Sequence, residues 1–297
     1  MRVNDHTDLI ELKPHGMEGF LSAYVLRGHR VAIIDPGPAA SVGSLIDELG
    51  ALGVELEDVT HVAATHIHID HAGGAGKLLK QLPNAKLLVH ERGAPHMIDP
   101  SRLWDGARRV MGERAEMYGE VEPAPSDRVT AATEGMTVDL GGGVKFEAVE
   151  TLGHASHALS FHEEKSGGVF VGDAAGMYVM SHDVTLPTTP PPFFLESALE
   201  SLDRLWALRP EAIYYAHFGF TSQRKRLRCY RHQLTLWAGV IAEAAEEGLG
   251  VPEIYERLKE EDEMVRAAEG VLERSPLYRE NVLLSIHGFL DRLRRAG

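Results

Sequence analysis

The stretch VAATHIHIDHAGG, residues 62–74, decides which fold the rest of the chain can form. It begins as an apolar run, typical of a strand that is buried on both faces. It then brings three histidines and an aspartate within six residues. From Ala72 to Leu82 the apolar spacing predicts a helix. The polar side chains therefore lie where a buried strand ends and a helix begins, which is where open α/β sheets place their ligand sites.

The spacing of these polar residues suits metal ions. His66 and His68 are two positions apart on an extended segment, so both side chains point to the same side. Asp70 and His71 fall in the following turn, where the backbone rotates and can direct them to a second point nearby. Imidazole and carboxylate groups together suit Zn²⁺, Fe or Mn²⁺. A polar loop at a sheet edge is the alternative, and four potential ligands so close together disfavour it.

The composition is that of an ordinary globular protein. The 297 residues, 44% hydrophobic and 25% charged, allow one large domain or one domain with an appendage. A net charge of −14 makes nucleic acid an unfavoured partner. The single Cys229 cannot form an intramolecular disulfide. The polar first residues and the lack of a long apolar run predict a cytoplasmic protein that does not enter the membrane.

Strands and helices alternate through the first part of the chain, which indicates an α/β layer arrangement. Predicted strands cover residues 9–12, 21–26, 31–34, 59–64, 85–89, 137–140, 144–149, 158–162, 168–171 and 212–216. Predicted helices cover residues 41–52 and 194–208, and residues 177–192 look irregular. Prolines and charged residues between 91 and 125 predict short helices inserted between strands, as a lid or a substrate wall.

Everything after residue 220 is predicted to be helical. A long helix carries Leu227, Tyr230, Leu234, Trp237 and Ile241 on one face. Shorter helices follow at 251–258 and 264–272, and a last helix begins after an N-cap at residue 275. We therefore divide the chain into a domain at 1–220, with its insertion at about 91–125, and a helical subdomain at 221–297. The subdomain covers the site or forms the interface of a homodimer.

Three further candidate ligands follow strands in the same manner as the first four. His154 comes after the strand at 144–149, Asp173 after the strand at 168–171, and His217 after the strand at 212–216. Gly172 allows the backbone to approach closely just before Asp173. Each is a polar residue at the exit of an apolar strand.

These residues resemble the metallo-β-lactamase superfamily. HIHIDH at 66–71 fits its His-x-His-x-Asp-His motif. The pairs Gly153-His154, Gly172-Asp173 and Ala216-His217 follow in the order of its later metal ligands, and Asp35 matches its early structural aspartate. The resemblance spans roughly residues 8–220 and implies an α/β fold, the αββα sandwich, with a dinuclear metal site. It implies that the first metal is held by His66, His68 and His154, and the second by Asp70, His71 and His217, with Asp173 bridging them.

Two metal ions, most simply Zn²⁺, would explain such a ligand set. Cations ~3.5–4 Å apart share a water and lower its pKa toward ~7, which provides hydroxide at neutral pH. Asp70 is the predicted catalytic residue, because it can orient that hydroxide and help a proton reach the leaving group. The motif around His154 is shorter than usual, so His157 is the alternative ligand. We favour His154, with His157 facing the substrate.

We expect a hydrolase of a small carbonyl substrate, either a lactone or a thioester such as an acylglutathione or acyl-CoA. In outline the chain looks like the hydroxyacylglutathione hydrolases, or glyoxalase II. Tyr178 and His182 follow Asp173 and are candidate substrate contacts, and Asp35 is a supporting residue. In that group, C-terminal helical elements hold the glutathione carboxylates. The basic cluster, Arg224, Lys225, Arg226, Arg228 and Arg231, either does so here or forms a solvated or dimer-contacting face.

Other functions use the same ligands. Iron-dependent redox chemistry on sulfur or oxygen substrates is the main alternative, because these ligands also accept Fe. Phosphodiester or RNA hydrolysis is a weaker alternative that rests only on the basic cluster. A metal-binding protein without catalysis is disfavoured, because no expected ligand is missing.

Overall fold

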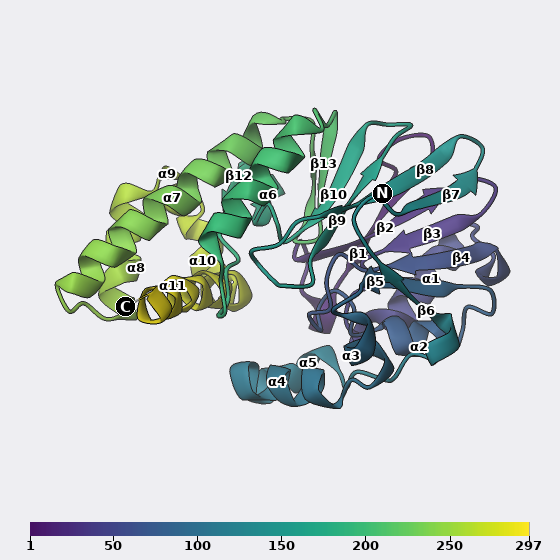
Figure 1. Ribbon diagram of the computed structural model, residues 1–297, viewed down its shortest axis with the longest axis horizontal. Coiled ribbons are helices and arrows are strands. Elements are labelled where there is room, and N and C mark those ends of the chain that lie inside the picture. The colour runs from purple at the N-terminus through teal and green to yellow at the C-terminus, as the bar shows by residue number, and fades with distance from the viewer. Residues whose placement is uncertain (297) are drawn as a thin grey trace.

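The computed structural model describes residues 1–296 and contains two six-stranded sheets that pack face to face (Figure 1). The first sheet has the order β1 (Thr7–Leu12), β2 (Leu21–Arg27), β3 (Val31–Ile34), β4 (Val59–Ala63), β5 (Lys86–His90), β6 (Val129–Ala132). The second has the order β14 (Gly219–Thr221), β13 (Ala212–Tyr215), β10 (Gly168–Gly172), β9 (Leu159–Glu163), β8 (Val144–Glu150), β7 (Thr137–Gly141). Helices cover both outer faces, so the predicted αββα sandwich is confirmed.

Alternation of side chains along the strands explains why two layers form. In β2, Ala23 and Val25 belong to the core under the outer helices, whereas Tyr24 and Leu26 belong to the core between the sheets. The same alternation on β10 sends Phe170 into the space between the sheets. Because successive side chains of a strand point to opposite faces, a strand that is apolar at every position is buried on both.

The outer helices are of two kinds. The first sheet is covered by α1 (Val42–Ala51) and the short α2 (Ala75–Leu79), and the second by α6 (Leu195–Ala207) and α7 (Lys225–Glu246). Buried side chains of α7, such as Leu234 and Trp237, belong to the same apolar cluster as Ile213 of β13. The C-terminal helices thus share a core with the sandwich, and the division of the chain at residue 220 stays a prediction.

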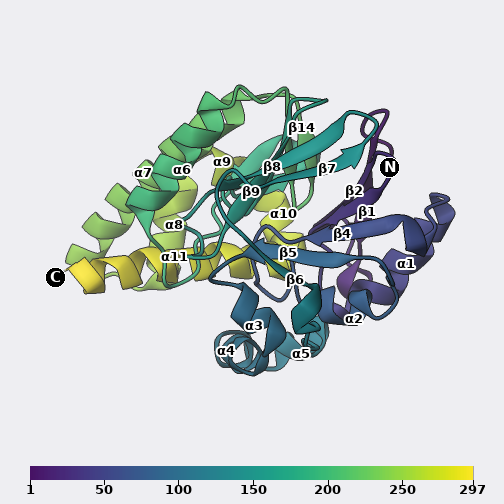
Figure 2. The ribbon, with the colours of Figure 1, turned by 45° about the vertical axis from the view of Figure 1, so that its right-hand side comes forward.

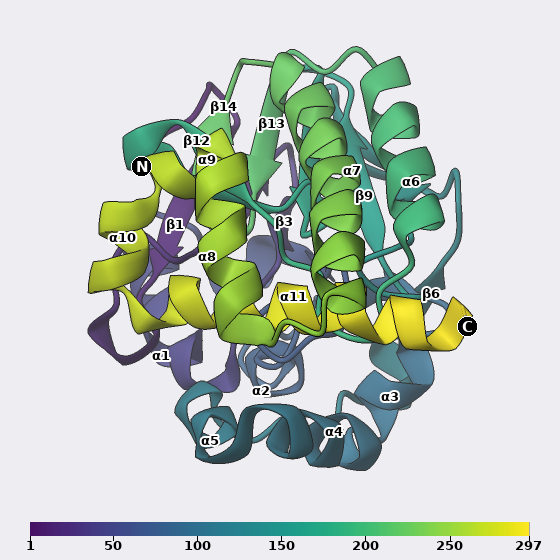
Figure 3. The same cartoon turned by 90° about the vertical axis from the view of Figure 1, so that its left-hand side faces the viewer.

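Two further helical segments lie on the outside of the sandwich and face each other (Figures 1 and 2). Between β5 and β6 the chain forms α3 (Ala94–Ile98), α4 (Ser101–Met111) and α5 (Ala115–Tyr118). After α7 come α8 (Val251–Glu261), α9 (Glu263–Ala267), α10 (Glu269–Arg274) and α11 (Pro276–Ala296). Figure 3 shows α11 crossing the molecule above α4 and α5. Within residues 1–296, no helix is both long and apolar enough to cross a membrane.

Three predictions of secondary structure are wrong. Residues 72–74 form turns, so α2 begins only at Ala75. Gly74 packs closely on residues 37–38, where a Cβ would lie 3.0 Å from their carbonyl oxygens. The segment taken as irregular contains the hairpin of β11 (Met177–Val179) and β12 (Val184–Leu186). Residues 219–221 pair with β13 as the strand β14, which was not predicted, and the helix expected from residue 221 begins only at Lys225.

Candidate metal centre

Strand ends from both sheets bring the predicted ligands to one edge of the sandwich. Strands β3 and β4 run parallel, as do β10 and β13, so their carboxyl ends lie on the same side. The loop after β4 carries His66 to His71, and the residues after β10 and β13 are Asp173 and His217. His154 lies in the loop after β8. Seven side chains from four separate parts of the sequence therefore meet at one place.

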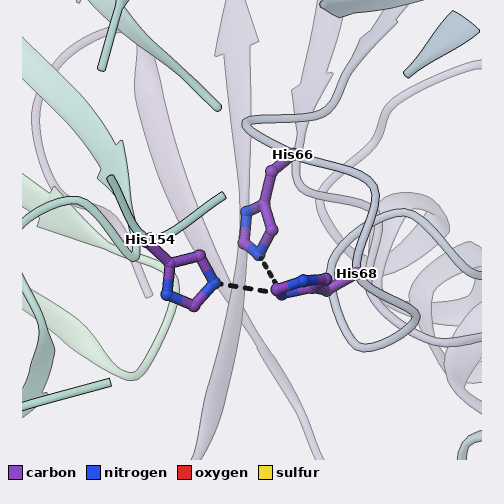
Figure 4. Close-up of side chains that lie close together, drawn as sticks. All are labelled: His66, His68 and His154. Carbon is purple, nitrogen blue, oxygen red and sulfur yellow. Dashed lines mark hydrogen bonds between the residues drawn. The ribbon is translucent and has the colours of Figure 1, made fainter. Parts of the chain in front are cut away.

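The first group contains three imidazoles whose nitrogens point toward one another (Figure 4). Nδ1 of His68 lies 3.0 Å from Nε2 of His66 and 3.0 Å from Nε2 of His154. Three nitrogens bound to one tetrahedral Zn²⁺ at 2.0–2.1 Å would lie about 3.3 Å apart. The spacing therefore fits three ligands of a single metal ion.

The second group combines Asp70 with two buried histidines. Oδ2 of Asp70 lies 3.8 Å from Nε2 of His71 and 3.5 Å from Nε2 of His217. Both imidazoles are almost wholly buried, whereas the Asp70 side chain is 22% exposed. This group can hold a second cation, with Asp70 as the ligand that also reaches solvent.

Asp173 lies between the two groups. Its Oδ2 is 3.4 Å from Nε2 of His154, and its Oδ1 is 3.3 Å from Nε2 of His71 and 3.6 Å from Nε2 of His217. Oδ1 of Asp173 and Nε2 of His71 are buried, yet neither makes a hydrogen bond within residues 1–296. Buried polar atoms are almost always satisfied, so this pair fits a cation that both would bind.

Groups behind the imidazoles fix their orientation. Nδ1 of His71 lies 3.4 Å from Oδ2 of Asp35. Nδ1 of His154 lies 2.7 Å from the carbonyl oxygen of Thr188, and Nδ1 of His217 lies 3.3 Å from that of Phe20. An N–H that donates to such an oxygen leaves Nε2 with its lone pair directed into the site. In neutral His154 and His217 this is the tautomer that a metal requires, and in His71 a bound cation would take the place of the Nε2 proton.

Asp35 and Gly172 connect the two sheets beneath the site. Asp35 adopts a left-handed backbone conformation with φ of 51° and accepts hydrogen bonds from the backbone N–H and the hydroxyl of Thr65. Gly172 has the same φ, and a Cβ on it would lie 2.4 Å from Oγ1 of Thr65. Only glycine fits there, as the sequence predicts.

The electrostatics separate the two groups. Burial, together with the neighbouring imidazoles, lowers the pKa of His66 and His68 well below the usual range, so both are neutral ligands at pH 7. Burial also disfavours the charged form of His71, but the carboxylates of Asp173, Asp70 and Asp35 outweigh it and raise the pKa of His71 to about 10. Such a negative field favours a cation at the second group.

A cavity of about 370 Å³ opens directly onto these ligands. Its floor includes His68, Asp70, His154, Asp173 and His217. Its walls come from α4, from α11 and from the prolines at 190 and 191. Its volume lies within the usual range for small-molecule sites.

His157 lies beside the first group but outside it. Its ring is 5.8 Å from the ring of His68, centre to centre, and it lines the cavity. Its buried Nδ1 makes no hydrogen bond with any residue in the range 1–296. Burial, followed by the nearby His154, lowers the pKa of His157 to about 4. The structure thus brings His154 to the other ligands and leaves His157 facing the cavity.

Tyr178 and His182 do not line the cavity, contrary to the prediction for substrate contacts. Tyr178 is buried in the β11–β12 hairpin, where it stacks on Tyr215 and donates a hydrogen bond to Asp183. His182 is exposed and lies beside Ser181. The hairpin, which the sequence did not reveal, turns both side chains away from the metal ligands.

The basic cluster is also placed away from the cavity and is largely paired. Arg226 is buried against Asp183, and Arg231 pairs with Asp203. The guanidinium groups of Arg224 and Arg228 lie 3.8 Å and 4.0 Å from the ring centre of Trp206. These cations support the packing of α7 and do not line the cavity.

The insertion at 91–125 was expected to form a lid or a substrate wall, and its helix α4 does line the cavity. What sequence reasoning missed is that α4 and α11 form this wall together. Leu103, Ala107 and Val110 of α4 recur at helical spacing, which marks one face of a helix. Leu277 and Leu284 of α11 do the same more than 160 residues later. The two faces are visible in the sequence, but nothing in the sequence indicates that they face each other.

Comparison with known proteins gives a consistent family. The family model described as Metallo-beta-lactamase superfamily matches residues 17–217. A metallo-beta-lactamase fold-containing protein of Sulfurisphaera tokodaii is 31% identical over 210 residues, which cover 68% of this chain and 74% of that protein. A hydroxyacylglutathione hydrolase of Cupriavidus metallidurans is 29% identical over 196 residues, covering 64% and 59% respectively.

Solved structures agree with the sequence matches. A crystal structure of an archaeal metallo-beta-lactamase superfamily protein from Sulfolobus tokodaii has a TM-score of 0.66 at 29% identity, covering 77% of this chain and 85% of the other. A metallo-beta-lactamase family protein from Thermus thermophilus has a TM-score of 0.70 at 22% identity, covering 100% and 95%. At 22% identity, the similarity to the Thermus thermophilus structure shows a shared fold only, and it extends over the C-terminal helices because the whole chain is covered.

Proposed function

The chain belongs to the metallo-β-lactamase superfamily, and from this premise we propose that it is a dinuclear metal-dependent hydrolase of a small carbonyl substrate, a thioester or a lactone. The observation that carries the proposal is the position of Asp173, whose two oxygens face the two groups of ligands at the floor of one cavity. Zn²⁺ is the simplest occupant, because imidazole and carboxylate ligands suit it.

Each ligand has a role in this proposal. His66, His68 and His154 would hold one metal ion, Asp70, His71 and His217 would hold the other, and Asp173 would serve both. When bound, such a pair of ions supplies an activated water and polarises the scissile carbonyl. Asp35 keeps His71 in the binding tautomer.

The remaining residues of the floor act on the substrate. Asp70 is the partly exposed carboxylate of the second group, so it orients the attacking water and passes a proton to the leaving group. His157 has a buried, unsatisfied Nδ1 beside the cavity, which fits a hydrogen bond with the substrate. The buried surroundings strengthen both interactions, because the effective dielectric is low there.

A carbonyl substrate is favoured over a phosphodiester. The basic cluster lies outside the cavity and is paired within the protein, so it does not supply a phosphate-binding surface at the ligands. The relative from Cupriavidus metallidurans is named for hydrolysis of an acylated glutathione, which is a thioester.

A substrate panel tests this proposal. The Zn²⁺-loaded protein is assayed with S-acyl thioesters, lactones and bis-p-nitrophenyl phosphate, before and after treatment with a chelator. We expect hydrolysis of at least one carbonyl substrate, its loss with the chelator, and its return when Zn²⁺ is added. Hydrolysis that persists without metal, or hydrolysis of the phosphodiester alone, would contradict the proposal.

A further inference from the structure

The cavity above the metal ligands is apolar on the sides that α4 and α11 provide. On α4 the wall is formed by Leu103, Ala107 and Val110, and on α11 by Leu277 and Leu284. Val110 is 57% exposed although it is a large apolar residue. An apolar wall that ends at a site for carbonyl chemistry fits a substrate with a hydrocarbon chain.

Gly106, in the middle of α4, leaves an open space in this wall. A Cβ built on it would meet no atom within 4 Å outside its own helix, and its φ lies outside the left-handed region. Neither the turn of the backbone nor a close contact therefore requires glycine, which costs about 0.5–1 kcal/mol relative to alanine inside a helix. Because Gly106 lines the cavity, the space that it leaves is space for a ligand.

The charges that line the cavity disfavour a polyanionic group in the part of the substrate that the cavity encloses. Among the described residues that line it, Arg102 carries the only guanidinium or ammonium group, and it is exposed. Asp70, Asp173 and Glu280 bring carboxylates to the same lining. The proposed function assigns Asp70 and Asp173 to the metal ions, so Glu280 is the carboxylate left in the lining. Phosphates such as those of coenzyme A would find one exposed cation, Arg102, among the described lining residues, so such a portion stays in solvent.

We propose that the cavity between α4 and α11 binds an apolar, medium-length acyl chain, and that Gly106 determines how long this chain can be. The inference rests on the proposed function, because it assigns the acyl side of the carbonyl substrate. A cavity of about 370 Å³ lies near the lower end of the usual range for small-molecule sites. That volume suits a chain of medium length and is too small for a large conjugate.

A chain-length series tests the inference directly. p-Nitrophenyl esters from acetate to decanoate are assayed with the Zn²⁺-loaded protein. Each buried methylene contributes about 0.8 kcal/mol, so kcat/KM is expected to rise by about fourfold for each added methylene until the cavity is full. A kcat/KM that is independent of chain length, or highest for acetate, would overturn the inference while leaving the proposed function intact.

Two matched variants examine the position of Gly106. Gly106→Leu fills the open space beside α4. The control Gly239→Leu makes the same change in α7, at an exposed glycine outside the cavity where an added Cβ would also meet no atom within 4 Å. We expect Gly106→Leu to lower kcat/KM for decanoate at least tenfold more than for acetate. Gly239→Leu should keep the wild-type series. Equal effects of both variants would overturn the role of Gly106.

A binding measurement separates failure of this inference from failure of the proposed function. 1-Decanol, which has an apolar chain but neither a charge nor a scissile carbonyl, is titrated into the Zn²⁺-loaded protein by calorimetry, so that hydrolysis does not contribute. Binding to the wild type that Gly106→Leu weakens supports the acyl site even if no ester in the series is hydrolysed. Absence of binding to the wild type overturns the site, whether or not esters are hydrolysed.

Discussion

Oδ2 of Asp35 lies 3.4 Å from Nδ1 of His71, on the side of the imidazole away from the metal-facing Nε2. Replacing Asp35 with Asn keeps the shape and tolerates the left-handed backbone but removes the negative charge behind the ring. Loss of such a partner typically lowers metal affinity by about 10- to 100-fold. We expect this decrease for the Asp35→Asn variant, measured by competition with a chromophoric chelator.

The control for that variant is Asp47→Asn, an exposed aspartate on α1. It should bind metal as the wild type does. Equal affinities of Asp35→Asn and the wild type would show that Asp35 only supports the loop at Thr65.

Asp70 is expected to be needed for catalysis more than for folding. Its carboxylate is partly exposed and faces the cavity, so Asp70→Asn should leave the melting temperature close to that of the wild type. Loss of an acid–base group lowers rates by about 10²- to 10⁴-fold, and we expect kcat to fall within that range. Measuring kcat on the best substrate, with circular dichroism as the folding control, tests this. Full turnover in a folded variant would exclude the role given to Asp70.

Alanine variants of His154 and His157 should behave differently. His154 belongs to the first ligand group, so His154→Ala is expected to lose bound metal. His157 faces the cavity beside that group, so His157→Ala should keep its metal and show a higher KM or a lower kcat. Metal analysis of the two proteins side by side decides between them. The reverse pattern would make His157 the ligand.

Glu163, far from the metal centre, should make stability depend on pH. It is fully buried, and burial favours its neutral form, but hydrogen bonds from Ser166, His6 and the backbone of Lys165 lower the pKa of Glu163 below 4.5. A carboxylate with a depressed pKa in the folded state stabilises the protein above its unfolded pKa, and this contribution disappears as the pH falls through the folded pKa. Glu163→Gln should therefore cost about 1–3 kcal/mol at neutral pH.

The measurement compares the free energies of unfolding of wild type and Glu163→Gln between about pH 6.5 and about pH 3.5. We expect the difference to shrink toward the acid end of the range. If the difference in unfolding free energy stays constant across this pH range, the packing of the Glu163 side chain, and not its charge, is responsible.

The place where the candidate ligands meet could be predicted from sequence because each one follows a predicted strand. The strands before Asp173 and His217 are apolar throughout, whereas the strand before His154 alternates and carries Lys145 and Glu147. Buried parallel strands direct their carboxyl ends to one edge, so His66, Asp173 and His217 were expected to meet there before any geometry was known. The tautomer of each imidazole could not be predicted, because it depends on backbone oxygens such as those of Phe20 and Thr188.

Substrate contacts were harder to predict than ligands. Tyr178 and His182 are close to Asp173 along the chain, but the hairpin of β11 and β12 decides where their side chains point. Each of these strands has only three residues, and such short strands have little sequence signal. The cavity wall depends on α4 facing α11 across the cavity, which is a tertiary arrangement of segments about 170 residues apart. Amphipathic spacing predicts that each helix packs on something, without naming its partner.

Metal titration combined with an activity assay tests the proposed dinuclear hydrolase most directly. Chelator-treated protein is titrated with Zn²⁺, bound metal is measured by mass spectrometry, and hydrolysis of the best thioester or lactone is followed at each step. We expect hydrolysis to reach its maximum at about two bound ions per chain, as in two-metal sites. Maximal hydrolysis with no bound metal, or with a single bound ion and no further binding, would contradict the proposal. A preference for iron over zinc, together with oxygen consumption, would favour redox chemistry instead.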